Sequence, residues 1–401
     1  MRITKVKARQ VFDSRGTPTV EAEVHVGSTV ASAIVPSGAS TGIHESLELR
    51  DGGTAYHGKG VTKAVANANA VGRKLVGHKY TQKDFDGYLE RLEGDRHKHL
   101  FGANADLALS MAYCRAMAQY HHVPLYRHVA SLCGKKRIQL PVPAMNMING
   151  GMHAGTRLDF QECLLYPKGR SFADMMRTGV EIYWDMKAAL KKKYGPLATN
   201  VGDEGGFAPP FDMIEKALLF LDGVVKGRAK IGLDVAASSF YKNGSYKLCG
   251  KKTDTAQLLR LHERIINRFK LASVEDPFQE EDFVSFGQLL AKVRNKCLIV
   301  GDDLLVTQTD RIQWAIDQNS CNCLLLKLNQ VGTVSEAIDA GLLAQENGWK
   351  VMVSHRSGDT EDPFIADFAC GIGADFIKSG APCRSERVAK YNRLLRIEEE
   401  I

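Results

Sequence analysis

The chain has 401 residues, 44% of them hydrophobic and 25% charged, and a formal net charge of +7. This composition is typical of a soluble globular protein, and no apolar run approaches the ~20 residues that a membrane-spanning helix requires. The length predicts two or three domains of roughly 150 residues, or one large α/β barrel with a smaller partner.

Bulk properties also argue against several kinds of partner. The mild positive charge comes without interleaved aromatic residues or a recognisable nucleic-acid module, so we expect neither a nucleic-acid nor a membrane partner. The nine cysteines contain no CxxC pair, which favours reduced thiols in the cytosol over disulfides or a zinc site. The first ten residues, MRITKVKARQ, alternate like a strand and lack a signal-peptide core.

Residues 1 to about 38 are predicted to form a β-meander. The stretches ITKVKARQV, TVEAEVHV and TVASAIV alternate or run apolar, and the turn sequences DSRGTP and GS separate them. Apolar positions then recur at helical spacing in residues 61–76, 82–92 and 104–122, which predicts three helices.

A polar, basic segment near residues 134–139 separates this region from the rest of the chain. We therefore expect an N-terminal α+β capping domain at residues 1–134 and an α/β barrel at residues 139–401. The first two barrel strands are predicted at residues 140–148 and 160–167. Only about eleven residues separate them, too few for a crossover helix, so the second strand is predicted to run antiparallel to the first.

Two predicted helices follow, and then six apolar runs that each end in charged residues. The ends of these runs lie 23 to 41 residues apart, more than the dozen or so residues that a parallel crossover needs. All eight strands together give the order ββαα(βα)6, which closes into a barrel with its active site at the C-terminal strand ends. The charged residues at the six ends are Asp234, Glu275 with Asp276, Asp302 with Asp303, Lys327, His355 with Arg356, and Lys378.

Three of these carboxylates, Asp234, Glu275 and Asp302, end successive parallel strands and can converge on one point. Close, unpaired carboxylates would repel one another, and a cation resolves the conflict. An all-oxygen site favours Mg²⁺. The alternative is that each carboxylate pairs with a nearby lysine or arginine.

Lys327 and Lys378 end strands beside this carboxylate cluster. A nearby divalent cation and a second ammonium group would both lower the pKa of a lysine, which suits it to act as a general base. The alternative is a lysine whose ammonium group reaches water or a strand-end carboxylate.

Three loops are candidates to complete the site. The segment VGDEGGFAPP, residues 201–210, could hold the carboxyl group of Glu204 over the barrel mouth, although DEGG is usually an exposed turn. The segment VPSGASTGIHE, residues 35–45, is rich in small residues and hydroxyls, as a mobile lid over a phosphate or metal would be. His153 lies in a glycine-rich turn, NGGMHAG, which suggests close approach to a ligand.

The segment SHRSG offers Arg356 with Ser354 and Ser357 as a phosphate grip. One reaction suits a site that combines a metal ion, a lysine base, a separate carboxyl acid and an anion-binding group. That reaction removes a proton next to a carboxylate and then expels a β-leaving group, while metal ions stabilise the dianionic intermediate.

The whole chain resembles the enolase family. The motifs that carry the resemblance are, in order, VFDSRGTPTVEAEV, PSGASTG, GANA, NGGMHAG, GDEGGFAP, VEDPF, GDDL, KLNQVGT, SHRSGDTED and KSGAPCRSERVAKYNRLLRIEEE. The resemblance implies reversible, Mg²⁺-dependent dehydration of 2-phospho-D-glycerate to phosphoenolpyruvate in glycolysis and gluconeogenesis. It also implies a cytoplasmic homodimer, with residues such as Arg15 near the interface, and two Mg²⁺ ions in each active site.

The resemblance also implies a role for each site residue. Lys327 would abstract the C2 proton, and Glu204 would protonate the departing C3 hydroxyl. Asp234, Glu275 and Asp302 would bind the first Mg²⁺ beside the substrate, and Ser40 would help to hold the second. The remaining substrate-binding positions are His153, Gln161, Glu162, Ser354, His355, Arg356, Ser357 and Lys378.

The departures from the family pattern are small: Asp359 replaces the usual Glu, Thr156 the common Asn, and Ser239 the common Glu. None of them is an expected ligand or proton-transfer residue. Two other functions remain as alternatives. One is an acid-sugar dehydratase or racemase of the same superfamily, which would lack both the GDEGG acid and the SGAST lid. The other is a non-catalytic or additional binding role on the same fold.

Overall fold

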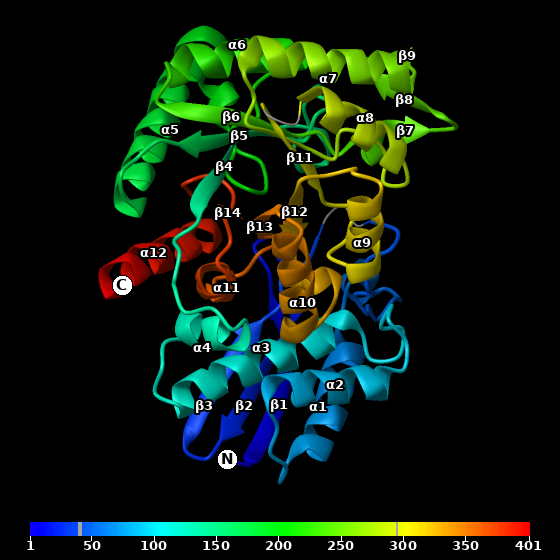
Figure 1. The fold of residues 1–401 in the computed structure, drawn as a ribbon, viewed down its shortest axis with the longest axis vertical. Coiled ribbons are helices and arrows are strands. Elements are labelled where there is room, and N and C mark those ends of the chain that lie inside the picture. The colour runs from blue at the N-terminus through cyan, green and yellow to red at the C-terminus, as the bar shows by residue number, and fades with distance from the viewer. Residues whose placement is uncertain (39–41, 294–295) are drawn as a thin grey trace.

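The structure is a computed structural model that describes residues 1–38, 42–293 and 296–401 (Figure 1). Its N-terminal part is a three-stranded antiparallel meander of β1 (Ile3–Phe12), β2 (Pro18–Val26) and β3 (Thr29–Ile34), as predicted. Buried residues alternate with partly exposed ones along most of β2 and in β3, so one face of these strands packs on helices, whereas only Ile3 and Ala8 are buried in β1.

Four helices cover the meander at one end of the molecule (Figure 1). They are α1 (Thr62–Leu75), α2 (Gln82–Glu93), α3 (Ala103–Tyr120) and α4 (Leu125–Leu132). The first three were predicted and α4 was not. Helix α3 is buried on almost every side because it lies between the sheet, α1 and α4.

The second part is a closed eight-stranded barrel with the order β10-β11-β12-β13-β14-β4-β5-β6. Its strands are β4 (Val142–Asn149), β5 (Glu162–Pro167), β6 (Ala229–Asp234), β10 (Ser273–Glu275), β11 (Leu298–Gly301), β12 (Cys323–Leu326), β13 (Lys350–Ser354) and β14 (Phe376–Lys378). Strand β5 is antiparallel to β4 and β6, and the other neighbouring pairs are parallel. The predicted fold class, an α/β barrel of ββαα(βα)6 order with one antiparallel strand, is confirmed.

Helices surround the barrel in the predicted alternation. They are α5 (Phe172–Tyr194), α6 (Ile214–Val225), α7 (Thr255–Phe269), α8 (Phe283–Val293), α9 (Thr309–Asp317), α10 (Val334–Glu346), α11 (Phe364–Ile372) and α12 (Ser385–Glu400). One feature was not predicted, a small sheet of β7 (Tyr241–Lys242), β8 (Ser245–Leu248) and β9 (Lys251–Thr253) between β6 and α7. Its strands are too short to show an alternating pattern.

The N-terminal part is joined to the barrel beside the C-terminal strand ends. Ser37 and Gly358 exchange backbone hydrogen bonds of 2.7 and 2.9 Å. A side chain at position 358 would lie 2.2 Å from Asp13 Oδ2 and 2.3 Å from Arg15 Nη2, so only glycine fits there. This bridge fixes the start of the 35–45 segment next to the SHRSG loop.

Among the described residues, no helix is long and apolar enough to span a membrane. The nine cysteines are all free, and seven of them are buried.

A fully buried histidine in α7 predicts acid sensitivity. His262 Nε2 lies 2.8 Å from the carbonyl oxygen of Pro277, and burial lowers the pKa of His262 to about 4. The unfolded chain, with a histidine pKa of ~6.5, binds this proton more readily than the folded chain does. The contribution of unprotonated His262 to the free energy of unfolding is therefore complete above pH ~6.5. It decreases as the pH falls towards 4, by about 3 kcal/mol in total.

Urea unfolding from pH 7 to pH 4 measures this effect. A His262→Gln variant keeps a side-chain donor for Pro277 and loses the titrating group. We expect the free energy of unfolding of this variant to fall less steeply with acid than that of the original chain. Equal slopes for the two proteins would contradict the assignment.

Candidate active site

The predicted site residues surround one small cavity at the C-terminal end of the barrel. Its lining consists of Gly38, His153, Gln161, Glu162, Glu204, Asp234, Asp302, Lys327, Ser354, His355, Arg356, Ser357 and Lys378. Of the other predicted residues, Glu275 contacts the cavity through Lys378, and Ser40 lies outside the described residues. The cavity volume is about 20 Å³, enough for about one water molecule.

Lys378 occupies the centre of the predicted metal site. Asp234 and Glu275 are register partners at the ends of β6 and β10. Lys378 Nζ, from the end of β14, lies 3.0 Å from Asp234 Oδ2 and 2.9 Å from Glu275 Oε1. Glu162 Oε2 is 3.2 Å from the same nitrogen. This buried set of carboxylate oxygens already surrounds one positive charge, and its donor chemistry fits a hard divalent cation.

The carboxylates and the ammonium group shift one another's pKa values. Burial raises the pKa of Glu275 well above its usual range, and Asp234 adds to the effect. Burial lowers the pKa of Lys378, but the carboxylates around it more than offset this, so the net shift is strongly upward. In this arrangement Lys378 therefore carries a positive charge and lies between carboxylates.

Lys327 follows β12 and forms an ion pair with Asp302, with 2.5 Å between Nζ and Oδ2. The other carboxylate oxygen, Oδ1, accepts a hydrogen bond from Gln330 at 2.9 Å. Burial lowers the pKa of Lys327 and Arg356 adds to this, but the carboxylates Asp302, Glu45 and Asp303 together offset both, so the net shift is upward. The expected lowering requires a divalent cation beside Lys327, so it stays a prediction for the metal-bound site.

A second acidic group was not predicted as a site. Carboxylate oxygens of Asp276, Asp302 and Asp303 lie within 4.8 Å of one another; Asp276 and Asp302 are buried, and Asp303 is half-buried. Asp276 accepts hydrogen bonds from the backbone nitrogens of Asp302 and Asp303, at 2.9 and 2.7 Å. Burial and the Asp302 charge raise the pKa of Asp276 well above its usual range. The signal in the sequence was the doubled acid after each strand, in VEDPF and GDDL.

Glu204 lies across the cavity in a buried cluster with His153 and Glu162. His153 Nδ1 is 3.5 Å from Glu204 Oε1 and 3.2 Å from Glu162 Oε1. Asn146 donates a hydrogen bond of 2.9 Å to Glu204 Oε2. His355 Nε2 lies 3.5 Å from the same oxygen.

The pKa values of the two carboxyl groups in this cluster differ strongly. Burial raises the pKa of Glu162 to about 7, and the charge of Glu204 adds to this. Burial acts in the same direction on Glu204, but His153 and His355 reverse it and hold the pKa of Glu204 well below its usual range. Burial lowers the pKa of His153, but the charges of Glu204 and Glu162 more than offset this. Both neighbours of the Glu204 carboxylate therefore hold a proton more readily than usual. Two carboxyl groups with divergent pKa values are a common arrangement for acid–base work.

Arg356 is paired with a residue that the sequence analysis missed. Its Nη1 and Nη2 donate to the two carboxylate oxygens of Glu45 at 2.9 and 3.2 Å, and Nη1 also donates to Asn329 Oδ1 at 3.0 Å. A Cβ atom on Gly38 would lie 2.0 Å from Arg356 Nη2, so glycine allows this backbone to pass the guanidinium. The bidentate geometry that suits a phosphate is thus filled by a carboxylate.

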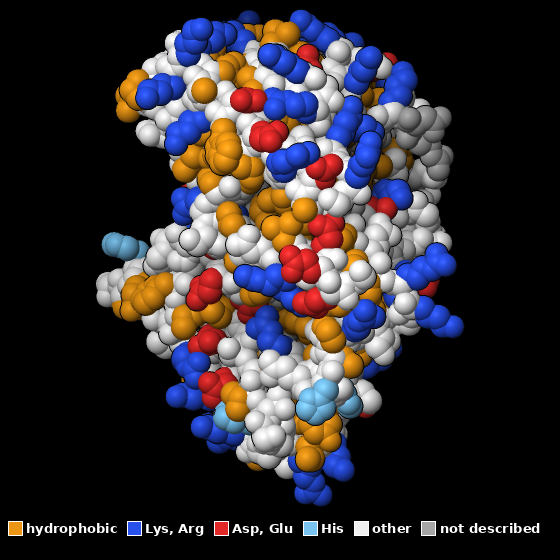
Figure 2. Space-filling view, turned by 90° about the vertical axis from the view of Figure 1, so that its left-hand side faces the viewer, with side chains coloured by type: hydrophobic (Ala, Val, Ile, Leu, Met, Phe, Trp, Pro, Cys, Tyr) orange, Lys and Arg blue, Asp and Glu red, His pale blue; other side chains and the backbone are white. Residues whose placement is uncertain are grey.

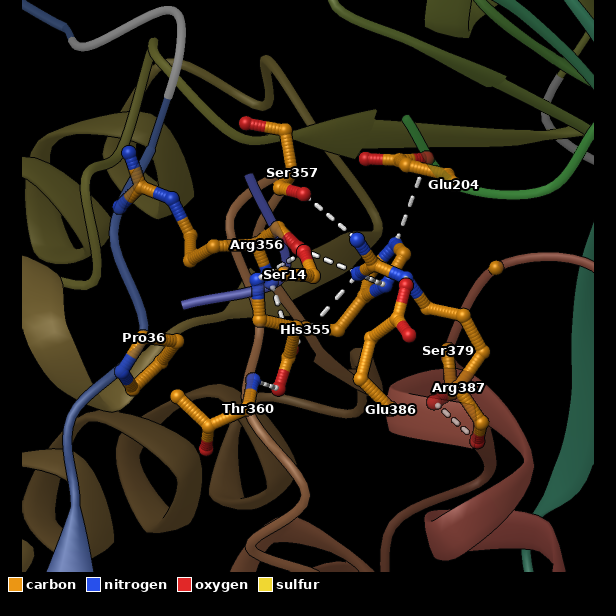
Figure 3. Close-up of polar contacts among 12 residues, drawn as sticks. Ser14, Pro36, Glu204, His355, Arg356, Ser357, Thr360, Ser379, Glu386 and Arg387 are labelled. Carbon is orange, nitrogen blue, oxygen red and sulfur yellow. Dashed lines mark hydrogen bonds and ion pairs between the residues drawn. The ribbon is translucent and has the colours of Figure 1, made fainter. Parts of the chain in front are cut away.

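Arg387 of α12 is a second residue without a predicted role. Its side chain is fully buried, and it donates to the carbonyl oxygens of Arg356 and Ser357, each at 2.5 Å (Figure 3). Arg15 donates to Ser357 Oγ at 3.2 Å and to the Ser37 carbonyl at 3.1 Å. Arg387 therefore fixes the backbone of the SHRSG loop, and Arg15 holds the side chain of Ser357.

Comparisons with known proteins agree with this arrangement. A family model described as "Enolase, N-terminal domain" matches residues 3–129, and one described as "Enolase, C-terminal TIM barrel domain" matches residues 137–401. The chain is 50% identical to "Enolase" of Solanum lycopersicum and 48% identical to "Enolase 2" of Hevea brasiliensis. Both alignments cover 100% of this chain and 95% of the plant protein.

Proposed function

The chain belongs to the enolase family of lyases, the phosphopyruvate hydratases of glycolysis, and from this premise we propose how its own residues carry the reaction. The reaction is the reversible dehydration of 2-phospho-D-glycerate to phosphoenolpyruvate. The observation that supports the assignment of roles is that two groups suited to proton transfer, Lys327 and Glu204, line the same cavity and have separate sets of partners.

Lys327 is the proposed base for the C2 proton. Its ammonium group is held by Asp302, so it acts as a base once that pairing is weakened in the loaded site. Glu204 is the proposed acid for the departing C3 hydroxyl. Glu204 is deprotonated in this arrangement, so we propose that it takes up a proton from the neighbouring His153 and Glu162 before it acts as the acid. Gln161 precedes Glu162 at the start of β5 and lines the same cavity.

The proposed cofactor is Mg²⁺, two ions per site. Asp234, Glu275 and Asp302 would hold the first and Ser40 would help to hold the second, while Asp276 and Asp303 supply further carboxylates beside Asp302. When bound, Mg²⁺ neutralises the charge that develops on the substrate carboxylate. The oxygen-only donor set around Lys378 and the raised pKa of Glu275 fit a site built for positive charge.

The phosphate is proposed to bind at Arg356, with Ser354, His355, Ser357 and Lys378 around it. In this structure the Arg356 guanidinium is hydrogen-bonded to the Glu45 carboxylate. The cavity, at about 20 Å³, is too small for the substrate. We therefore propose that the phosphate replaces the Glu45 carboxylate at Arg356. This exchange would move residues 42–45 and enlarge the cavity.

We also propose a cytoplasmic homodimer built from two domains, residues 1–134 and 139–401. The segment between the domains, residues 133–141, contains no helix or strand.

Hydrophobic side chains are exposed on the face that carries α5 and α12 (Figure 2), where a groove of about 320 Å³ includes Trp184 with 64% of its surface exposed. Such an exposed aromatic residue is typical of an interface. Nine free cysteines favour a reducing compartment.

An assay of phosphoenolpyruvate formation tests the function and its metal requirement. With 2-phosphoglycerate and Mg²⁺ we expect an absorbance rise from the enol product, loss of this activity with excess chelator, and recovery when Mg²⁺ is restored. The expected loss is at least ~10³-fold, because the dianionic intermediate forms only when the positive charge of a metal ion compensates its negative charge. Absence of product at every Mg²⁺ concentration would overturn the proposed function.

A further inference from the structure

The guanidinium of Arg387 lies beneath the two loops that carry Glu204 and His355 (Figure 3). Its Nη1 donates to His355 Nδ1 at 2.6 Å and to the Arg356 carbonyl, and its Nη2 donates to the carbonyls of Ser357 and Asp203. A side chain on Gly380 would lie 2.9 Å from Arg387 Cδ and 2.7 Å from the Glu204 carbonyl, so the surroundings are tightly packed. Among the described residues, the Arg387 side chain thus contacts a ring nitrogen of His355 and also donates to backbone carbonyls of both loops, at Asp203, Arg356 and Ser357.

The contact with Nδ1 has a definite chemical meaning. A guanidinium has only donors, so a nitrogen that it contacts must offer a lone pair. His355 Nδ1 therefore carries no proton, and in a neutral ring the proton lies on Nε2. That nitrogen is buried, lies 3.5 Å from Glu204 Oε2 and makes no hydrogen bond in the described part of the chain, so Glu204 is the acceptor towards which its N–H can be directed.

The charges around His355 act in the same direction. Burial lowers the pKa of His355 to about 4, and the Arg387 cation opposes protonation as well, although Glu204 and Asp359 favour it. Asp359 is itself neutralised by Lys390, whose Nζ lies 2.5 Å from Oδ1. The imidazole ring is therefore neutral at physiological pH, with one N–H.

We propose that Arg387 is a positioning residue that fixes His355 in the Nε2–H tautomer and directs this N–H at the Glu204 carboxylate. Through this contact Arg387 sets the orientation and charge of the group that we assign as the acid. The effect on rate rests on the proposed function, whereas the tautomer itself does not. Nitrogen spectroscopy tests the tautomer and kinetics tests its consequence, so failure of one is distinguishable from failure of the other.

NMR of the full-length protein labelled with ¹⁵N-histidine reads the tautomer directly. The His355 signals are identified by their loss in a His355→Gln variant. We expect an unprotonated Nδ1 and a protonated Nε2 that do not change between pH 6 and pH 8. A protonated Nδ1, or a ring that titrates in this interval, would overturn the proposal even if no variant of Arg387 folds.

Kinetics of an Arg387→Met variant measure the consequence. We expect kcat to fall by ~100-fold with a smaller change in KM, since misplacement of a catalytic group by about 1 Å has an effect of this size. We also expect the loss of activity on the acid side to begin nearer neutral pH, because His355 can then be protonated. Arg387→Lys, which keeps a single donor for Nδ1, should restore part of the rate and the original pH profile.

Arg393→Met is the matched control on the same helix. Arg393 forms an ion pair of 2.7 Å with Asp367, away from the cavity, so this variant should lose stability without a change in pH profile. If Arg387→Met folds and keeps the original His355 signals and pH profile, Arg387 has only a structural role and the proposal fails.

Discussion

Replacement of Lys327 by alanine is expected to lower kcat by about 10³- to 10⁴-fold, the usual contribution of a positioned general base. Its side chain lines the cavity after the end of β12, and the one other lysine among the described lining residues, Lys378, lies between Asp234 and Glu275. Exchange of the substrate C2 hydrogen with deuterated solvent should be lost to the same extent as dehydration. Initial rates of phosphoenolpyruvate formation and ¹H NMR of the C2 hydrogen measure the two effects.

The Lys327→Ala variant also leaves Asp302 without its buried partner. Loss of one member of a buried ion pair destabilises a protein by about 3–5 kcal/mol, so the melting temperature must be measured and assays run well below it. Lys350→Ala is the matched control, since Lys350 pairs with Asp375 at the opposite end of the neighbouring strand β13. This control should retain full activity. A folded Lys327→Ala enzyme with a near-normal rate of C2 exchange would remove Lys327 from the role of base.

Replacement of Glu204 by glutamine is expected to lower dehydration by about 10²- to 10³-fold, within the range of an acid catalyst. The amide is isosteric with the carboxyl group, so it can remain near Asn146 and His153 while losing the ability to transfer a proton. Lys327 is unchanged in this variant, so exchange at C2 should continue after dehydration has stopped. The ratio of the two rates, measured on one sample, is the decisive quantity.

Asp203→Asn provides the control for Glu204→Gln, because it alters the neighbouring carboxyl group of the same loop, whose side chain does not line the cavity. Equal losses of exchange and dehydration in Glu204→Gln would mean that Glu204 acts in proton abstraction or in assembly of the site. An unchanged dehydration rate would move the acid role to His153 or Glu162.

The architecture was largely predictable because local patterns determine it. Each parallel strand shows a short apolar run that ends in a charged residue, and the eleven-residue spacer before β5 excluded a crossover helix. Helix α4 and the β7–β9 sheet were missed for physical reasons. Helix α4 has only eight residues, and the strands of the small sheet, YK, SYKL and KKT, contain no apolar run like those that mark the equally short barrel strands.

The site was predictable only in part. Strand register brings Asp234 and Glu275 together, and register follows from the fold. The pairing of Arg356 with Glu45 spans 311 positions and depends on how two loops pack, which no local pattern encodes. The ion pair of Lys327 with Asp302 joins residues of different strands, so the upward shift of the Lys327 pKa in this arrangement also could not be read from local sequence.

The backbone bridge between Ser37 and Gly358 limits how this enzyme could be shortened or recombined. Because Gly358 leaves no space beside Asp13 and Arg15, the barrel loop of residues 354–358, proposed to bind the phosphate, is shaped by the turn between the first two strands of the meander. A gene fragment that encodes the barrel alone would lack one wall of its own cavity. Exchanging the N-terminal part with that of a distant relative should therefore succeed only when the 354–358 loop is exchanged with it.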